Sequence, residues 1–386
     1  MAIGTVAVGG YAVAFSMAQV VVKTDPALAF RLASYDGRLA AAQAAALQRM
    51  AVTSGKGLPA GWLAAKALRQ DPTAVAAVMV LAVEAELRRD QARARRNLRY
   101  AQKLSRRDVS MQLWSIETAV AAGDVSGALK WYDITLRTDP AMSETLFPVL
   151  AAATAEVPIR EQLMHTLAGN PQWGGQFMRY LAVHSADPRI PAALFTALHK
   201  VKVGVPEDAR TDTINRLIAR GELDDAWSFY ALDRSGASRS RSRDPGFIAE
   251  LETPSSLDWV PINDNGTTTL IQDGALEFSA AAAVGGPLLR QTQLLAPGDY
   301  QLIGRSADVD QSEDSRPYWT LTCLDGRETG RVALPNSPGS SASFSGIFRV
   351  PDRSCKVQIL TLIGRPSDRV EGLSGRIERA ELAPAR

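Results

Sequence analysis

The spacing of apolar residues changes character along the chain. Residues 25–234 carry apolar positions three and four apart, typical of amphipathic helices, and residues 257–386 carry short alternating segments between turn residues. Between them, residues 235–256 lack apolar periodicity and begin with a stretch rich in Ser, Gly and Arg, which predicts a flexible linker. With residues 1–24 as a separate N-terminal helix, the pattern predicts a multidomain α + β protein, ending in an antiparallel β-sandwich.

The N-terminal run has no charged residue from Ala2 to Val22. Such a length is enough for a helix to cross a hydrocarbon core of about 30 Å, so a transmembrane signal-anchor is one interpretation. The small residues of Ser16-Met17-Ala18 instead allow a cleaved signal peptide, and a buried core helix is the third interpretation. We expect export with an inner-membrane anchor and the bulk in the periplasm. Secretion after signal cleavage is the alternative.

The helical part repeats with a period of 34 residues. Three series share this spacing: Ala60, Ala94 and Ala128; Ala64, Leu98 and Tyr132; Ala67, Ala101 and Thr135. Asp90 recurs as Asp124. The clearest unit, residues 112–140, has a Gly123-Asp124 turn, Ala128 and Tyr132 four apart, and a closing Asp139-Pro140.

This unit resembles a tetratricopeptide repeat, and the resemblance covers about residues 25–234. It implies an α-solenoid in which each helix pair covers the apolar face of the next. It also implies a groove that binds a protein partner. Residues 143–205 lose the strict period, and residues 214–232 recover it around Gly221-Glu222.

The C-terminal part is expected to form strands about ten residues apart, typical of a sandwich or barrel. The expected strands are 257–262, 267–271, 275–280, 288–295, 299–306, 319–324, 331–334, 343–350, 356–363 and 375–382. The strand at 356–363 is apolar on both faces, which predicts a central position.

Three segments of this part, at residues 294–307, 318–323 and 348–362, resemble the galactose-binding-like jelly rolls of carbohydrate-binding modules. The resemblance implies a possible polysaccharide ligand. Exposed aromatic residues stack on sugar rings, so Trp259, Tyr318 and Trp319 are the ligand candidates. Core positions are the alternative for each, and a regular strand turns Tyr318 and Trp319 to opposite faces.

The chain has two cysteines, Cys323 and Cys355, both in the C-terminal part. In an exported protein they would pair, and a loop of this length makes such a disulfide worth about 3–4 kcal/mol. Two buried free thiols are the alternative.

Charge is unevenly distributed although the net charge is +2. Residues 1–244 contain 30 Lys and Arg against 23 Asp and Glu, and the rest contain 13 against 18. Neither part is basic enough to require nucleic acid. On one helix, Arg89, Arg93, Arg96 and Arg99 would share a basic face for an acidic protein, a polyanionic glycan or anionic lipid, or they form a solvated surface.

The sequence contains no signature for a catalytic or cofactor site, so none is assigned. Asp308, Asp310, Ser312 and Asp314 alternate like the start of a calcium loop. However, Glu313 replaces the turn glycine and Trp319 the closing glutamate, so an acidic surface loop is favoured over a metal site.

These patterns predict a non-catalytic, membrane-anchored periplasmic scaffold in which the repeats bind a protein and the sandwich binds a glycan or a second protein. The pairing of domains implies envelope or exopolysaccharide assembly in a Gram-negative bacterium. One alternative is a carbohydrate-active hydrolase or lyase with its cleft on the sandwich. Another is a cytoplasmic regulator with a buried N-terminal helix.

Overall fold

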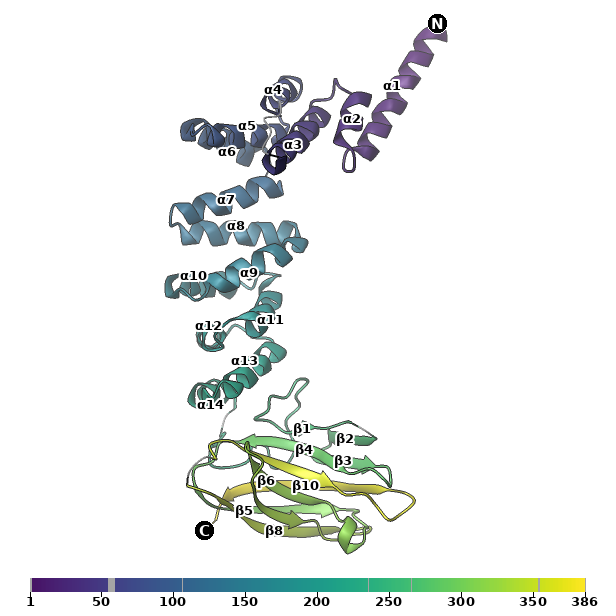
Figure 1. Cartoon of the computed structure of the whole chain (residues 1–386), viewed down its shortest axis with the longest axis vertical. Coiled ribbons are helices and arrows are strands. Elements are labelled where there is room, and N and C mark those ends of the chain that lie inside the picture. Colours follow the sequence, from purple (N-terminus) through teal and green to yellow (C-terminus); the bar gives the residue numbers. More distant parts are fainter. Residues whose placement is uncertain are drawn as a thin grey trace. The chain divides into compact units, whose positions relative to one another are not determined.

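The computed structural model describes residues 2–54, 60–105, 107–234, 236–264, 266–352 and 355–385. The chain forms two compact units, Met1–Leu146 and Phe147–Arg386, which are described separately. Figure 1 shows helices in the N-terminal half and strands in the C-terminal part, as the sequence predicts.

The first unit is helical. Its helices are α1 (Ala2–Val21), α2 (Pro26–Leu32), α3 (Gly37–Ser54), α4 (Ala60–Gln70), α5 (Val75–Leu87), α6 (Gln91–Leu104), α7 (Val109–Ala121) and α8 (Val125–Thr138), followed by the short η1 (Pro140–Met142). Helix α5 packs on α6 and α7 packs on α8 as antiparallel pairs. All nine residues of the three 34-residue series are buried, so the repeat in the sequence marks the packed faces of the helices.

Two turns between paired helices, 34 residues apart in the sequence, have the same structure. Asp90 and Asp124 cap α6 and α8, because their carboxylates accept hydrogen bonds from the backbone N–H groups of Arg93 and Gly127. Just before each cap, Arg89 and Gly123 have left-handed φ values of 60° and 69°. This turn corrects the expected basic face of one helix. Arg89 lies in the turn that ends α5, whereas Arg93, Arg96 and Arg99 lie on α6.

Helix α1 covers the apolar N-terminal run. Its Ala18 is buried, whereas Val13 and Val20 are 60% and 78% exposed, so residues 11–21 of α1 are mostly exposed. Within the described ranges, no helix is both long and apolar enough to cross a membrane, and the expected anchor is therefore unsupported.

The second unit begins within α9 (Ser143–Ala153) and continues with stacked helices. These are α10 (Val157–Ala168), α11 (Gly174–His184), α12 (Arg189–Lys200), α13 (Glu207–Ala219) and α14 (Leu223–Ala231). Helix α10 packs on α12 and α12 on α14, while α11 packs on α13. Alternate helices thus form two layers.

The strands form a two-sheet antiparallel sandwich, as predicted. They are β1 (Val260–Pro261), β2 (Thr267–Gln272), β3 (Ala275–Ala280), β4 (Gly286–Gln293), β5 (Gly298–Ala307), β6 (Tyr318–Cys323), β7 (Glu328–Ala333), β8 (Ser341–Val350), β9 (Gln358–Gly364) and β10 (Leu373–Pro384). In the described residues, one sheet has the order β1-β4-β9-β6-β7 and the other β2-β3-β10-β5-β8. Strand β9, which the sequence predicts to be central, is the middle strand of the first sheet.

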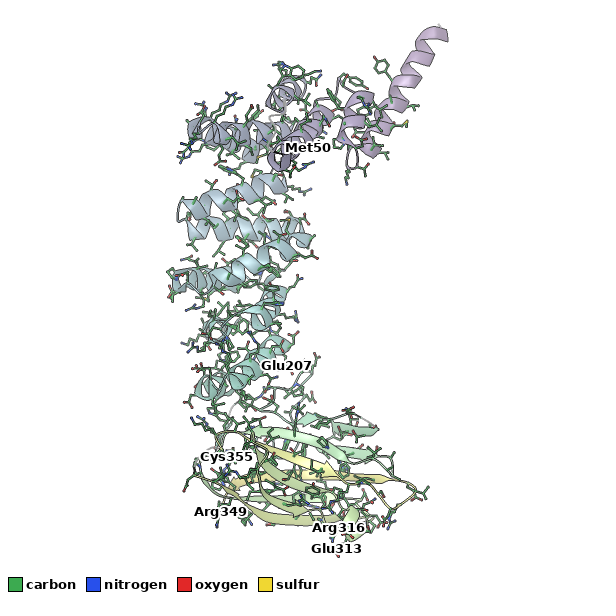
Figure 2. The ribbon with its side chains drawn as sticks, in the orientation of Figure 1. Met50, Glu207, Glu313, Arg316, Arg349 and Cys355 are labelled. Carbon is green, nitrogen blue, oxygen red and sulfur yellow. A yellow bond between two sulfur atoms is a disulfide. The ribbon has the colours of Figure 1, made fainter. Side chains whose placement is uncertain are left out.

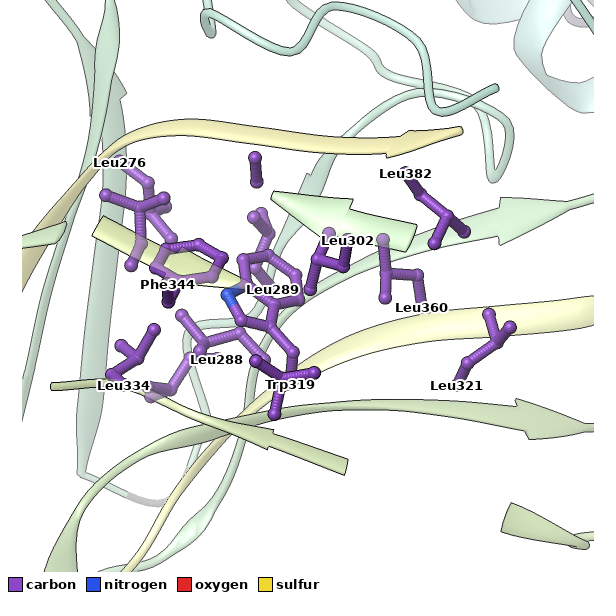
Figure 3. Close-up of a cluster of buried hydrophobic side chains, with 14 of the residues drawn as sticks. Leu276, Leu288, Leu289, Leu302, Trp319, Leu321, Leu334, Phe344, Leu360 and Leu382 are labelled. Atoms are coloured by element: carbon purple, nitrogen blue, oxygen red, sulfur yellow. The ribbon is translucent and has the colours of Figure 1, made fainter. Parts of the chain in front are cut away.

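The core of the sandwich lies between the two sheets. Figure 3 shows Trp319 among leucines from several strands, including Leu288, Leu302 and Leu360, and these side chains are all fully buried. The short helix η2 (Glu313–Ser315) lies in the connection from β5 to β6.

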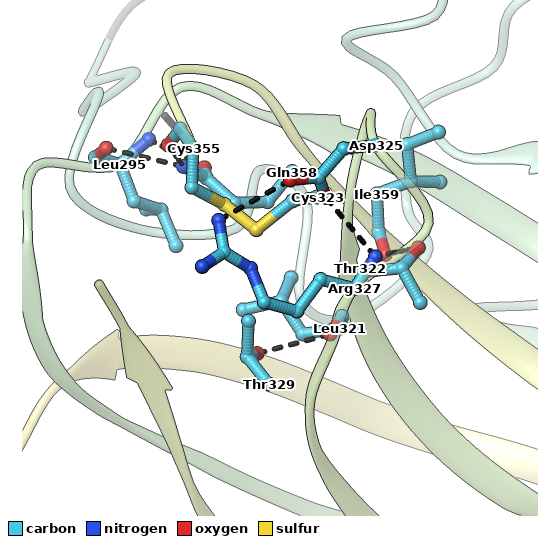
Figure 4. The surroundings of a disulfide bond; sticks show 10 residues. All are labelled: Leu295, Leu321, Thr322, Cys323, Asp325, Arg327, Thr329, Cys355, Gln358 and Ile359. Atoms are coloured by element: carbon cyan, nitrogen blue, oxygen red, sulfur yellow. Dashed lines mark hydrogen bonds and ion pairs between the residues drawn. A yellow bond between two sulfur atoms is a disulfide. The ribbon is translucent and has the colours of Figure 1, made fainter. Parts of the chain in front are cut away.

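The disulfide joins Cys323, at the end of β6, to Cys355, just before β9, which is the pairing expected from the sequence. Figure 4 shows the buried Gln358 beside it. The Gln358 side chain accepts a 2.9 Å hydrogen bond from the N–H of Leu295, so this end of the sandwich is closed by covalent and polar contacts.

Arg243 lies at the junction between the last helices and the sandwich. It is 6% exposed, although the sequence places it in a flexible linker. Its guanidinium donates to the carbonyl of Leu257 at 2.9 and 2.7 Å, to the carbonyl of Thr292, and to the Gln293 side chain at 2.7 Å. Burial lowers the pKa of Arg243 to about 10. The middle of the expected linker is therefore a packed part of the second unit, because these acceptors hold its arginine.

Further contacts connect α13 and α14 to residues 253–258. Glu207 (Figure 2) accepts a hydrogen bond from the N–H of Thr253 at 2.8 Å. The buried hydroxyl of Tyr230 donates to Asp258 at 2.8 Å. The helices and the sandwich of this unit thus share one polar junction.

We expect Arg243→Met to lower the free energy of unfolding by about 3 kcal/mol or more, because buried carbonyl and amide oxygens lose their donor. Urea unfolding followed by tryptophan fluorescence measures the change. Arg241→Met is the matched control, since Arg241 is exposed and only 3.4 Å from Glu381, and it should change stability by less than about 1 kcal/mol. Equal effects of the two variants would contradict the role of Arg243.

We expect the double variant Cys323→Ala/Cys355→Ala to lose about 3–4 kcal/mol of stability, because its unfolded chain is no longer cross-linked. The same urea experiment tests this against oxidised wild-type protein, and reduced wild-type protein should lose a similar amount. Mass spectrometry of non-reduced tryptic peptides should find the two cysteines linked. Alkylation of both thiols without reductant would contradict the bond.

Candidate functional site

The outer surface of the β1-β4-β9-β6-β7 sheet carries the candidate site. The strand register places Arg290 of β4 beside Thr361 of β9, Thr361 beside Thr320 of β6, and Thr320 beside Arg331 of β7. Neighbouring strands are about 4.8 Å apart, so this row spans about 14 Å. We call these four residues the arginine–threonine row. The two threonines in its middle are buried, and the Thr320 hydroxyl donates to the carbonyl of Gly330 at 3.2 Å, whereas the arginine at each end is exposed.

Tyr318 lies next to this row on the same surface and is half-buried. The guanidinium carbons of Arg331 and Arg365 are 4.1 and 5.0 Å from the centre of its ring, at distances typical of cation–π contacts. Arg331 also forms two hydrogen bonds of 3.1 and 3.0 Å with Glu328, which raise the pKa of Arg331. Arg365 donates to the carbonyl of Asp314 at 2.8 Å. The ring therefore already holds two fixed guanidinium groups.

The other two ligand candidates belong to the core. Trp319 is fully buried and Trp259 is 4% exposed, with their rings 5.7 Å apart. Trp259 donates to the carbonyl of Asp244 at 2.9 Å. Because side chains alternate along β6, the residue after Tyr318 must point inward. Neither tryptophan offers a ring face to a sugar, and only Tyr318 of the three candidates lies on the outer surface.

A cleft of about 1050 Å³ opens on another side of the sandwich. The acidic residues of its lining are Asp244, Glu250, Glu252, Asp258 and Asp273, and Trp259 also belongs to the lining. The cleft is therefore acidic, in contrast to the arginine–threonine row.

In the acidic stretch that resembles the start of a calcium loop, one carboxylate is paired with an arginine side chain. Asp310 forms an ion pair of 2.6 Å with Arg369, and Asp308 has a left-handed backbone with φ of 59°. In the part of the chain that is described, no three His, Cys, Asp or Glu side chains are grouped to hold a metal ion.

Helix α6 carries the remaining candidate surface. Arg93, Arg96 and Arg99 are exposed on it, together with Arg95. Among the described residues, no carboxylate lies within ion-pair distance of these four arginines. A groove of about 880 Å³ between α6 and α7 is lined by Arg95 and Arg99, with Leu98 and Trp114 as apolar lining.

Sequence reasoning missed Arg290, Arg331 and Arg365. They are far apart in the sequence, and only the strand register brings them onto one surface. The alternation that separates Tyr318 from Trp319 is the one signal in the sequence that pointed to this surface.

No protein-family model matches the chain, and no curated protein matches it. Solved structures with similarity include a CBM4 module, with 10% identity, a TM-score of 0.30, and coverage of 37% of this chain and 99% of that one. The CBM22-1 xylan-binding domain of Paenibacillus barcinonensis Xyn10C has 10% identity, a TM-score of 0.26, and coverage of 40% and 97%. The arabinose-bound MgGH51 α-L-arabinofuranosidase has 14% identity, a TM-score of 0.31, and coverage of 39% and only 27% of its own length. The carbohydrate-binding modules match the β-sandwich part.

We expect Arg93→Ala/Arg96→Ala/Arg99→Ala to leave the Tm within about 2 °C of wild type, because exposed like charges on one helix contribute no net stability. Thermal unfolding at low salt measures this. Arg38→Ala is the comparison, since Arg38, at the start of α3, forms an ion pair of 3.0 Å with Asp71, which directly follows α4. A large fall in Tm for the triple variant would show that these arginines hold the fold and are not available to a partner.

Proposed function

We propose that this chain is a non-catalytic scaffold whose β-sandwich binds a glycan on the sheet surface around Tyr318. The observation that carries the proposal is the pair of exposed arginines of the arginine–threonine row beside Tyr318, which places guanidinium groups and a half-buried aromatic ring on the outer face of one sheet. Guanidinium groups bind the oxygen atoms of sugars through hydrogen bonds. The row runs across the strands and is long enough to contact more than one sugar unit.

The helical part of this scaffold binds a protein partner, in the manner of a tetratricopeptide-like solenoid. Its support is the repeated turn at Asp90 and Asp124 and the exposed arginines of α6 beside the groove between α6 and α7. Arginines without carboxylate partners in the described structure favour an acidic partner surface.

The proposed setting is the periplasm, in envelope or exopolysaccharide assembly. The Cys323–Cys355 disulfide supports a compartment outside the cytoplasm, because disulfides persist in oxidising surroundings.

A second candidate function is a hydrolase or lyase acting in the acidic cleft. The carboxylates of Asp244, Glu250 and Glu252 in that cleft favour it, since glycoside hydrolysis uses paired carboxylates. Release of reducing ends from a bound polysaccharide, lost in Glu250→Gln and Glu252→Gln variants, would favour this enzyme over the scaffold.

We expect the full-length protein to bind glycans on a polysaccharide array, and Tyr318→Ala to weaken that binding about tenfold because Arg331 and Arg365 lose their common support. Ile347→Ala is the matched control, since Ile347 is an exposed residue of β8 in the other sheet. Absence of binding to any glycan, or equal binding by the Tyr318→Ala variant, would contradict the proposed site.

A further inference from the structure

The charge of the candidate surface differs from that of the domain around it. Residues 245–386 contain more acidic than basic residues, yet the strands of the β1-β4-β9-β6-β7 sheet contain one carboxylate, Glu328. That carboxylate is already paired with Arg331. In the described structure, neither Arg290 nor Arg365 has a carboxylate within ion-pair distance. Two guanidinium charges on this surface are therefore not neutralised by the protein.

The guanidinium groups near Tyr318 are held in position before any ligand arrives. Arg331 is fixed by Glu328 and the ring, and Arg365 is fixed by the ring and the carbonyl of Asp314. Long flexible side chains lose rotational freedom on binding, and prior fixation reduces that loss. A fixed guanidinium also presents its N–H groups in a planar fork that matches a carboxylate.

A neutral sugar would need a different surface. Stacking on a pyranose requires an open aromatic face, but the Tyr318 ring is in contact with two guanidinium groups. Trp259 and Trp319 are buried. Recognition here therefore depends on charge and hydrogen bonds and only weakly on stacking.

We infer that the ligand of this surface is an acidic polysaccharide, one whose sugar units carry carboxylate groups. This inference rests on the proposed glycan binding and names the class of glycan. Carboxylates of the ligand pair with Arg290, on the outer face of β4, and with Arg365, which follows β9 and contacts the Tyr318 ring. The chain of sugars lies on the outer face of this sheet, between these two arginines.

The test uses the full-length protein and two probes of one backbone: an oligogalacturonate and the same oligomer with its carboxyl groups methyl-esterified. Isothermal titration calorimetry is run at 50 and 300 mM salt. We expect the acidic oligomer to bind at least about tenfold more tightly than the ester, and its affinity to fall at higher salt. We expect Arg290→Ala and Arg365→Ala each to weaken binding of the acidic oligomer about tenfold, and the Lys variants to retain part of the affinity because they keep the charge.

Two controls separate this site from other basic surfaces. Arg349→Ala removes an exposed arginine of the opposite sheet that is paired with Asp299, and it should bind like wild type. Arg93→Ala/Arg96→Ala/Arg99→Ala removes the basic surface of α6 and should also bind like wild type. Circular dichroism of each variant confirms that the fold is retained.

The outcomes distinguish the two claims. Equal affinity for the acid and its ester would overturn the acidic-glycan inference and leave glycan binding intact, whereas binding to neither oligomer, together with an empty array, would overturn both. The inference would also be overturned if the Arg290→Ala/Arg365→Ala variant still bound the acidic oligomer and the triple variant of α6 did not. That result would place the polyanion on the helix. Equal affinity for poly-glutamate would do the same, since it would show attraction to any polyanion.

Discussion

The second unit depends on a cation that is buried among neutral oxygen atoms. The Arg243 guanidinium donates to backbone carbonyls of Leu257 and Thr292 and to the Gln293 side chain, while its own backbone exchanges two 3.0 Å hydrogen bonds with Gln291. A buried charge is tolerated only where its hydrogen bonds are satisfied, so these oxygen atoms must all be in place together. The strand β4, the segment before the sandwich and the end of the helical layers are thereby fixed in one arrangement.

In that arrangement, some parts of the sandwich are held by structural contacts, and the outer face of one sheet stays exposed. Tyr230 and Asp258 close the junction, and the Cys323–Cys355 bond closes the nearby end of β6 and β9. The outward surface of the same sheet keeps Arg290 and Arg331 exposed. A rigid sheet that is supported from behind can hold a row of side chains at constant spacing, which is what recognition of a repeating polymer requires.

The net charge does not reveal the two basic surfaces of the molecule, the one around Tyr318 and the one on α6. The C-terminal residues are acidic in total, but their carboxylates lie mainly in the 1050 Å³ cleft, in loops and on the other sheet, and only Glu328 lies on the strands that form the candidate surface. In the first unit, the carboxylates near α6 are used for capping or pairing, as in Asp90 and Glu84, and leave the helix arginines without partners. Local distribution, and not total charge, determines which ligands each surface attracts.

The sequence by itself determined the elements, because helical and strand periodicity are local properties. The 34-residue spacing of Ala94 and Ala128 identified buried helix faces, and alternation separated Tyr318 from Trp319 and located the strands, although the expected strand 257–262 is only Val260–Pro261. Only the tertiary structure decided that Arg243 is buried instead of lying in a flexible linker, since its acceptors Thr292 and Gln293 are 49 and 50 residues further along the chain. The same holds for the arginine–threonine row: strand register depends on packing of the whole sandwich, and no local pattern encodes which arginine lies beside which threonine.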